Sequence, residues 1–531
     1  MSRHGPELLA RTMLRSTLAV TRPSPRARAV AAASSQWRAS SSSSSNPVPS
    51  TSTDPSPTST NDHRSIGKSQ SLFLTHDSSP GTPFILPHGM RLARKVERVV
   101  RDLYDVYGYD EVQSPQLYKT SLWKRSGHWD NYRDDMFAAE GYKERLTRTT
   151  SPPQASSVEG RSACCSIGEG KEDESFGLKP MNCPGHCLIF ASQERSYRDL
   201  PIRYAEFSPL HRNEASGALT GLTRVRRFHQ DDAHVFCTPD QVAEEIESML
   251  AMLTSAYDTF GFSSFELVLS TRPEESFIGE VEEWDRAETA LKAALDASGR
   301  AWELNAGDGA FYGPKIDIRL VDGQGRRHQT ATIQLDFQLP RRFDLSYADP
   351  SSKEGRGVPV MIHRAILGSV ERFMAILIEQ TAGWWPFWLS PRQAIVIPAQ
   401  TNNPQLTQYA EGLTKYLSLG IHPSTSPAVS SERHLQRFYV DREHNAQNEK
   451  LGKLVRKAQL ARYNYILVVG EREMETNTVN VRRRDDKSAP ARLKELAAKG
   501  GWSGEGQAKG GQYDIKELRE LFCKLDRGHS W

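Results

Sequence analysis

The chain has 531 residues, of which 37% are hydrophobic and 25% charged, and its formal net charge is +3. This length suggests roughly two to four domains, and the apolar content excludes a globally disordered chain. Six cysteines in so long a chain exclude a disulfide scaffold. No stretch of roughly 18 residues is apolar enough for a transmembrane helix, so no membrane partner is expected.

The first 45 residues differ in composition from the rest of the chain. They contain seven arginines, one acidic residue and a serine run at 40–45. An arginine-rich, serine-rich and acid-poor leader is typical of a mitochondrial transit peptide, which predicts a mitochondrial matrix protein. A chloroplast address and an uncleaved basic tail are the alternatives. Because the leader is so basic, the net charge of the whole chain is no evidence for nucleic-acid binding.

Composition also suggests how the remaining residues are organised. Residues 46–65 are rich in Pro, Ser and Thr and are expected to be a disordered linker. A first folded domain is expected over 66–388, interrupted at 138–176 by a low-complexity segment that we expect to be a disordered insertion. A smaller domain with a C-terminal extension is expected over 389–531.

In the first domain, the hydrophobic spacing predicts a helix over Arg91–Tyr107 that ends at Gly108, then a strand over Val112–Leu117. The later strands cluster without regular helical crossovers. We therefore expect an α+β domain with a mainly antiparallel sheet flanked by helices. Its further predicted elements are, in chain order, a helix over Gln241–Phe260, strands over Phe265–Ser270, Ile316–Val321 and Thr330–Phe337, and a helix over Ala365–Thr381.

In the second domain, short apolar runs alternate with amphipathic stretches, which predicts a compact α/β domain. Its predicted elements are strands over Ala394–Pro398, Phe438–Val440 and Tyr465–Val469, and helices over Gln405–Leu417, Lys450–Ala461 and Ile515–Leu525.

Three separate segments contain a residue type that binds soft metal ions. These residues are Cys183, His234 and His363. None of the segments has the short CxxC or HExxH spacing that identifies a zinc site by itself. Taken singly, each residue is more simply a buried cysteine or a hydrogen-bonded histidine.

The arginine pattern suggests a phosphate site. Arg212 precedes a glycine-containing loop that leads to Arg224, and Arg372 lies far downstream. The planar guanidinium fork suits phosphate, and Phe228 could stack on a base. No GxxxxGK[ST] motif is present, so a nucleotide would be bound by arginines and not by a P-loop. The alternative is a set of surface ion pairs, each worth about 0–1 kcal/mol.

These segments resemble a known enzyme family. Gly108–Pro115, Arg203–Phe228 and Gly368–Phe373 resemble the three signature motifs of class II aminoacyl-tRNA synthetases. The likeness extends from about Ile66 to Arg484, apart from the insertion. The segments that resemble threonyl-tRNA synthetases in particular are Gly127–Tyr132, Lys179–His186, Gln230–Cys237, Phe311–Lys315 and Val360–Leu367.

The resemblance implies a class II catalytic domain followed by an anticodon-binding domain, in the mitochondrial type that lacks the N-terminal editing region. The implied reaction converts threonine and ATP, accompanied by Mg²⁺, to threonyl-adenylate and pyrophosphate. The threonyl group then passes to tRNA(Thr) for mitochondrial translation. A homodimer is expected. The alternative is a catalytically inactive synthetase-like protein that binds RNA or acts as an accessory subunit.

The resemblance also assigns the ATP contacts. Arg212 would contact the α-phosphate and Arg372 the terminal phosphates. Glu214 and Phe228 would contact adenine, assisted by Arg224.

For the amino acid, the resemblance implies a Zn²⁺ ion held by Cys183, His234 and His363, with a fourth position open to substrate. Threonine could bind zinc through its amino and hydroxyl groups, whereas valine lacks the hydroxyl. Serine has both groups, so we expect it to be activated as well. The remaining implied residues are Asp232 for the ammonium group, Tyr312, Gln334 and Gln230 along the pocket, and Lys315 for phosphate charge or the carboxylate.

In the C-terminal domain, the resemblance places Asn448, Glu473 and Arg482 where relatives contact anticodon bases. Amide, carboxylate and guanidinium groups suit hydrogen bonding to base edges. The run Arg482–Arg484 would suit the RNA backbone.

Overall fold

The computed structural model describes residues 61–141 and 175–529, except 263, 275–276, 322–325, 421–437, 444–448, 487, 492 and 496–509. The predicted transit peptide, nearly all of the predicted linker and residues 142–174 of the predicted insertion lie outside the described residues. Among the described helices, none is long and apolar enough to cross a bilayer.

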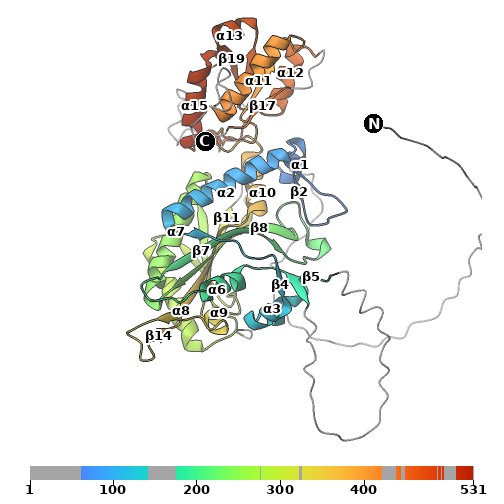
Figure 1. Ribbon diagram of the computed structural model, residues 1–531. Helices are drawn as coiled ribbons and strands as arrows, with labels where there is room; N and C mark the ends of the chain where they lie inside the picture. Colours follow the sequence, from blue (N-terminus) through green and yellow to red (C-terminus); the bar gives the residue numbers. More distant parts are fainter. Residues whose placement is uncertain are drawn as a thin grey trace, which may run out of the picture. The chain divides into compact units, whose positions relative to one another are not determined.

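An eight-stranded sheet forms the centre of the first domain (Figure 1). Its strand pairs are antiparallel except β10 with β9 and β3 with β7, which confirms the expected mainly antiparallel α+β arrangement. The strands lie in the spatial order β10 (Trp302–Asn305), β9 (Phe265–Ser270), β11 (Lys315–Val321), β12 (Arg327–Asp336), β15 (Val360–Ser369), β8 (Arg227–Cys237), β7 (Ile202–His211) and β3 (Asp110–Glu111).

Three long helices pack together on one face of this sheet: α2 (Pro87–Tyr107), α7 (Val242–Thr259) and α10 (Val370–Thr381) (Figure 1). Helix α2 ends as predicted at Gly108, whose φ of 68° is the left-handed conformation that favours glycine. On β8, Ala233 and Val235 join the core with these helices. Because side chains alternate along a strand, the residues between them face the opposite side of the sheet.

Shorter elements surround this core. The other helices are α1 (His63–Ser69), α3 (Thr120–Ser126), α4 (His128–Tyr132), α6 (Cys183–Ala191), α8 (Val281–Ala297) and α9 (Gln338–Arg342), with 3₁₀ turns η1 (Arg133–Asp135), η2 (Ser216–Ala218) and η3 (Pro239–Gln241). The small sheets pair β1 (Phe73–Leu74) with β2 (Phe84–Ile85), β13 (Tyr347–Ala348) with β14 (Arg356–Gly357), and β6 (Phe176–Leu178) with both β4 (Leu117–Lys119) and β5 (Ala138–Ala139).

Two predicted elements were wrong in part. The segment 365–369, expected to start a helix, continues strand β15 because it pairs with β8 and β12 in the middle of the sheet. The helix begins after Ser369, whose side chain caps it by accepting a hydrogen bond from the Arg372 amide. The predicted strand Val112–Leu117 is absent except at Leu117: β3 ends at Glu111, β4 begins at Leu117, and the segment between them contains Pro115.

Two predicted boundaries also shift. Helix α1 begins at His63, inside the predicted linker, because His63 is buried and its N–H is bound by Glu379 of α10. Ala138, Ala139 and Phe176, assigned to the insertion, lie in strands β5 and β6, which pair with each other.

The C-terminal domain is the expected α/β unit. Its sheet has the order β17 (Val440–Arg442), β16 (Ala394–Pro398), β18 (Tyr465–Val469), β19 (Thr478–Arg483) and β20 (Gly511–Asp514), and its helices are α11 (Pro404–Leu419), α12 (Leu451–Leu460), α13 (Glu471–Thr476) and α15 (Ile515–Arg527). The two strands flanking β16 run parallel to it, whereas β19 and β20 are antiparallel additions.

Candidate active site

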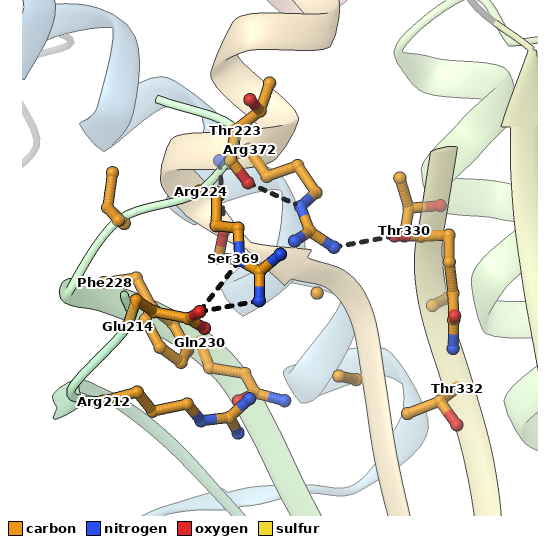
Figure 2. A pocket seen from close by; sticks show the side chains of 15 residues that line it. Arg212, Glu214, Thr223, Arg224, Phe228, Gln230, Thr330, Thr332, Ser369 and Arg372 are labelled. Atoms are coloured by element: carbon orange, nitrogen blue, oxygen red, sulfur yellow. Dashed lines mark hydrogen bonds and ion pairs between the residues drawn. The ribbon is translucent and has the colours of Figure 1, made fainter. Parts of the chain in front are cut away.

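A pocket of about 310 Å³ opens on the face of the main sheet that α10 does not cover. The guanidinium groups of Arg212 and Arg224, from the loop between β7 and β8, and of Arg372, from α10, converge on it (Figure 2). Phe228 and Gln230 of β8 form one wall, and Thr330 and Thr332 of β12 lie opposite.

Protein contacts already orient these arginines. Arg372 donates from Nε to the carbonyl oxygen of Thr223 at 3.0 Å, and Arg212 lies over the Phe228 ring, 5.1 Å from its centroid. Arg224 forms an ion pair with Glu214 at 2.8 Å. Burial and the nearby positive charges lower the pKa of Arg372. A polyanion in this pocket would relieve that repulsion.

The strand pairings place further polar residues in two rows across the same face. One row contains, on β8, β15, β12 and β11, His234, His363, Gln334 and Lys315. The next contains, on the same strands, Asp232, Ala365, Thr332 and Asp317. Residues two apart on a strand lie about 7 Å apart on one face, so the rows are neighbours. Ala365 and Thr332 also line the arginine pocket. The sheet therefore sets the histidine row directly beside the pocket.

Cys183, the first residue of α6, completes a cluster with the two histidines. The potential ligand atoms of Cys183, His234 and His363 all lie within 4.8 Å of one another, and all three residues are buried. Burial raises the pKa of the Cys183 thiol and lowers that of His234 well below its ordinary value. One sulfur and two neutral imidazoles are a donor set that suits Zn²⁺, whose charge would stabilise the thiolate.

A buried relay orients His234. Its Nδ1 lies 2.8 Å from Nδ1 of His186, and Nε2 of His186 lies 3.0 Å from Oε2 of Glu206. Glu206 also pairs with Lys179 at 2.8 Å and accepts from both the amide and the hydroxyl of Ser114. The carboxylate only accepts, so His186 donates from Nε2 and accepts at Nδ1. His234 must then donate from Nδ1, which leaves its Nε2 for the cluster.

His363 is fixed in the opposite tautomer. Its Nε2 lies 2.8 Å from Oδ2 of the fully buried Asp336, so this nitrogen donates and Nδ1 is left for the cluster. Asp336 is held in turn by two amides of the first turn of α9.

The residues predicted for the amino acid lie around this cluster. Asn182 donates to Asp232 at 3.0 Å, and burial raises the pKa of Asp232. The Tyr312 hydroxyl donates to Oε1 of Gln334 at 3.1 Å, and no partner among the described residues is found for the buried Nε2 of Gln334. Lys315 pairs with the buried Asp317 at 2.8 Å.

Sequence reasoning gave no role to several residues that orient this site: His186, Glu206, Asp336, Asn182 and His128. His128 lies against Cys183, with Nε2 3.6 Å from the sulfur, and burial lowers its pKa to about 4. Strand alternation could have identified Asp336, because it lies two residues after Gln334 on β12. His186 became visible only through its contacts with residues distant in sequence.

The predicted anticodon residues are only partly described. Asn448 lies outside the described residues. Arg482 is exposed on β19, whereas Glu473 accepts a hydrogen bond at 2.9 Å from the Gly470 amide and so caps its own helix. The proposal that the whole arginine run faces RNA needs correction, because Arg484 pairs with Asp486 and packs over the ring of Trp384.

Comparison with known proteins gives the class. Residues 166–381 match the tRNA synthetase class II core domain (G, H, P, S and T), and residues 393–499 match an anticodon binding domain. Together with the antiparallel sheet and its arginine pocket, these matches define a class II aminoacyl-tRNA synthetase. Within that class, the chain belongs to the threonine-tRNA ligase family, as the following relatives show.

The probable mitochondrial threonine-tRNA ligase of Schizosaccharomyces pombe is 45% identical over 429 residues, covering 80% of this chain and 84% of that protein. The cytoplasmic threonine-tRNA ligase of Saccharomyces cerevisiae is 49% identical over 425 residues. A crystal structure of the RNA binding domain of threonyl-tRNA synthetase from Cryptosporidium parvum is 41% identical, with a TM-score of 0.70, and covers 87% of this chain and 98% of that one.

The chain spans only part of some relatives. The matched region covers 80% of this chain but 51% of the S. cerevisiae protein and 52% of the probable cytoplasmic threonine-tRNA ligase 1 of Dictyostelium discoideum. The relatives include both mitochondrial and cytoplasmic proteins.

Proposed function

We propose that the chain is a threonine-tRNA ligase that forms threonyl-adenylate and pyrophosphate from threonine and ATP, then transfers the threonyl group to tRNA(Thr). The observation that supports this most directly is the adjacency of two sites on one sheet. The two histidines of the Cys183/His234/His363 cluster lie in the row next to Ala365 and Thr332, which line the arginine pocket. This arrangement sets a polyphosphate next to a site for a small polar amino acid.

In the first step, a carboxylate oxygen of threonine attacks the α-phosphorus of ATP in line, and pyrophosphate leaves. ATP enters as its Mg²⁺ complex. Arg212 neutralises charge that develops at the α-phosphate, and Arg372 neutralises the leaving pyrophosphate. Glu214 and Phe228 contact adenine with help from Arg224. Both Arg212 and Arg372 are oriented before substrate arrives, so little reorganisation is required when the charge moves.

The cluster suits Zn²⁺, which Cys183, His234 and His363 would hold. When bound, the ion would offer coordination to the amino and hydroxyl groups of threonine, which valine cannot match because it lacks the hydroxyl. Asp232 accepts a hydrogen bond from the substrate amino group, Tyr312 packs beside it against His363, and Gln230 contacts the amino acid from the wall of the arginine pocket.

Two further residues orient the substrate. The Nε2 donor of Gln334, for which no partner is found among the described residues, donates to a substrate oxygen. Lys315, held by Asp317, supplies positive charge near the carboxylate or the phosphates.

We also propose that the enzyme acts as a homodimer in the mitochondrial matrix, with an N-terminal transit peptide. The arginine-rich leader and the mitochondrial relatives support the location. In the C-terminal domain, the exposed Arg482, together with Glu473 and Asn448, would contact the anticodon of tRNA(Thr).

The test is amino-acid-dependent ATP–pyrophosphate exchange on the zinc-loaded protein, with threonine, serine, valine and proline, alongside zinc content. We expect exchange with threonine and, at higher concentration, with serine, but not with valine or proline. His363→Ala should lose both zinc and threonine-dependent exchange. If the folded, zinc-loaded protein supports no exchange with any amino acid, the ligase assignment is wrong and the inactive RNA-binding alternative takes its place.

A further inference from the structure

A buried histidine outside the pocket contacts the loop that carries part of the pocket. This loop, residues 212–226, joins β7 to β8 and contributes Thr223 and Arg224 to the lining. His63, the first residue of α1, is 4% exposed. Its Nε2 accepts a hydrogen bond at 3.2 Å from the backbone amide of Leu222. The N-terminal helix of the described chain therefore contacts the loop directly.

The contacts of His63 define its tautomer. Nδ1 lies 2.7 Å from Oε1 of Glu379, a carboxylate oxygen that can only accept, so Nδ1 carries the proton. Nε2 is then the lone-pair nitrogen that the Leu222 amide requires. Glu379 also accepts from the His63 backbone amide at 3.2 Å, and its other oxygen pairs with Arg326. The imidazole thus bridges helix α10 and the loop.

Asp62, His63 and Glu379 lie close enough together to suggest a second metal site. Their bonding argues against that role. Arg64 contacts both carboxylate oxygens of Asp62, Arg326 pairs with Glu379, and both ring nitrogens of His63 have protein partners. The lone pairs and negative charges that a cation would need are already used, so the cluster links parts of the protein.

Helix α10 is bonded to the loop at two consecutive loop residues, Leu222 and Thr223. Glu379 holds Leu222 through His63, and Arg372, seven positions earlier on the same helix, holds the carbonyl of Thr223 at 3.0 Å. Seven residues are about two helical turns, so both groups lie on one side of α10. The Leu222 side chain is fully buried in the core. A Cβ on the preceding Gly221 would approach His63 Nε2 to 2.2 Å, and the φ of Gly221 is +49°.

We propose that His63 is a positioning residue of the ATP site. In its neutral form it ties Leu222 to α10, which keeps Thr223 in place for Arg372 and keeps Arg224 in the pocket. The effect on ATP rests on the proposed function of that pocket. Loss of the Leu222 contact would let the loop move relative to Arg372 and weaken ATP binding. The amino-acid cluster, whose two histidines are oriented by His186 and Asp336 and not by the loop, would keep its affinity for threonine and zinc.

Two substitutions separate the two ring contacts of His63. In His63→Gln, the amide oxygen can take the place of Nε2 and accept from Leu222. In His63→Asn, the amide nitrogen can take the place of Nδ1 and donate to Glu379, but nothing reaches Leu222. We expect His63→Asn to raise the KM for ATP about tenfold in pyrophosphate exchange, because a buried amide loses its acceptor. His63→Gln should stay close to the parent protein, and neither should change the KM for threonine or the zinc content.

Hydrogen exchange on the substrate-free proteins provides a readout that does not depend on activity. Amides of residues 219–226 should exchange faster in His63→Asn than in His63→Gln, while strand β12 stays equally protected in both. Equal KM values for ATP or equal exchange in the two variants would overturn the proposal. If the parent protein supports no threonine-dependent pyrophosphate exchange, the proposed function fails, and the hydrogen-exchange comparison still decides whether His63 restrains the loop.

Discussion

The Nδ1 atoms of His186 and His234 lie 2.8 Å apart, and this contact determines which nitrogen of His234 faces Cys183. A hydrogen bond between two imidazole nitrogens needs one donor and one acceptor. Glu206 makes His186 the acceptor at Nδ1, so His234 presents Nε2 as a lone-pair donor. The Glu206 carboxylate, which reaches the cluster only through His186, thereby sets the tautomer of His234, a proposed metal ligand.

Replacing the middle member of this relay should weaken zinc binding. His186→Phe keeps a ring of similar size in a fully buried position but removes the acceptor for His234. We expect the zinc dissociation constant, measured by chelator competition, to rise about 10- to 100-fold, as is usual when the partner of a metal-bound histidine is lost. Tyr204→Phe is the matched control, because Tyr204 packs edge-on against His186 and its hydroxyl bonds elsewhere. Equal zinc affinity in the two variants would contradict the relay.

The arginine pocket predicts a sharp difference between two neighbouring arginines. Arg212→Lys keeps the charge but loses the planar fork, so we expect kcat for pyrophosphate exchange to fall roughly 10²- to 10³-fold. Arg227→Lys should have little effect, because Arg227 lies on β8 next to Phe228, where alternation turns its side chain away from the pocket. A comparable loss in both variants would show that Arg212 has no special role at the phosphate.

Glu206 predicts a pH dependence of stability. Burial acts to raise its pKa, but hydrogen bonds from His186 and Lys179 and the Lys179 charge outweigh burial and lower the pKa to about 2 from an ordinary value of 4.5. A group with a depressed folded-state pKa stabilises the fold above its unfolded pKa and loses that contribution as the pH falls through the folded value. The contribution at neutral pH is about 3 kcal/mol, lost between roughly pH 5 and pH 2.

Urea unfolding of the parent protein and of Glu206→Gln across this range provides the measurement. The free energy of unfolding should fall more steeply with acidification in the parent than in the variant. Parallel curves would mean that Glu206 has the same pKa in both states.

The C-terminal domain predicts a separation between activation and transfer. Arg482→Ala should raise the KM for tRNA(Thr) in aminoacylation about tenfold or more, and leave threonine-dependent pyrophosphate exchange unchanged, because Arg482 is exposed near the end of β19 in a separate domain. Arg483→Ala, one residue along the strand and therefore on its other face, is the control. Loss of exchange in Arg482→Ala would place this residue in a structural role.

The sequence predicted the bounds of several regular elements, both short apolar strands and one long helix. Strands β9, β16 and β18 have the predicted bounds, and α7 differs by one residue at each end. The prediction was wrong at residues 365–369, because an apolar run of this length fits a central strand as well as a helix. Pairing with both neighbouring strands makes this segment a strand. The Ser369 cap was the available signal for the true start of α10.

The site could be predicted in part for a similar reason. Resemblance grouped Cys183, His234 and His363, and the fold brings them together. The partners that fix each tautomer, His186 and Asp336, come from contacts between segments far apart in the chain, to which a motif search is blind. The sequence places His63 in the linker because that segment is rich in Pro, Ser and Thr, whereas its burial follows from contacts with Phe73, Leu222 and Glu379.

The two rows across β8, β15, β12 and β11 exist only when these strands pair in the correct register, so activity depends on that register. The residues of both rows point to one face, and the alternate residues fill the core behind it. A slip of one residue in any of these strands would exchange the two faces, burying polar groups and exposing the core. Misaligned molecules would therefore be both unstable and inactive. During refolding, recovery of pyrophosphate exchange should follow correct pairing of the central strands, and near-native sheets with shifted strands should show none.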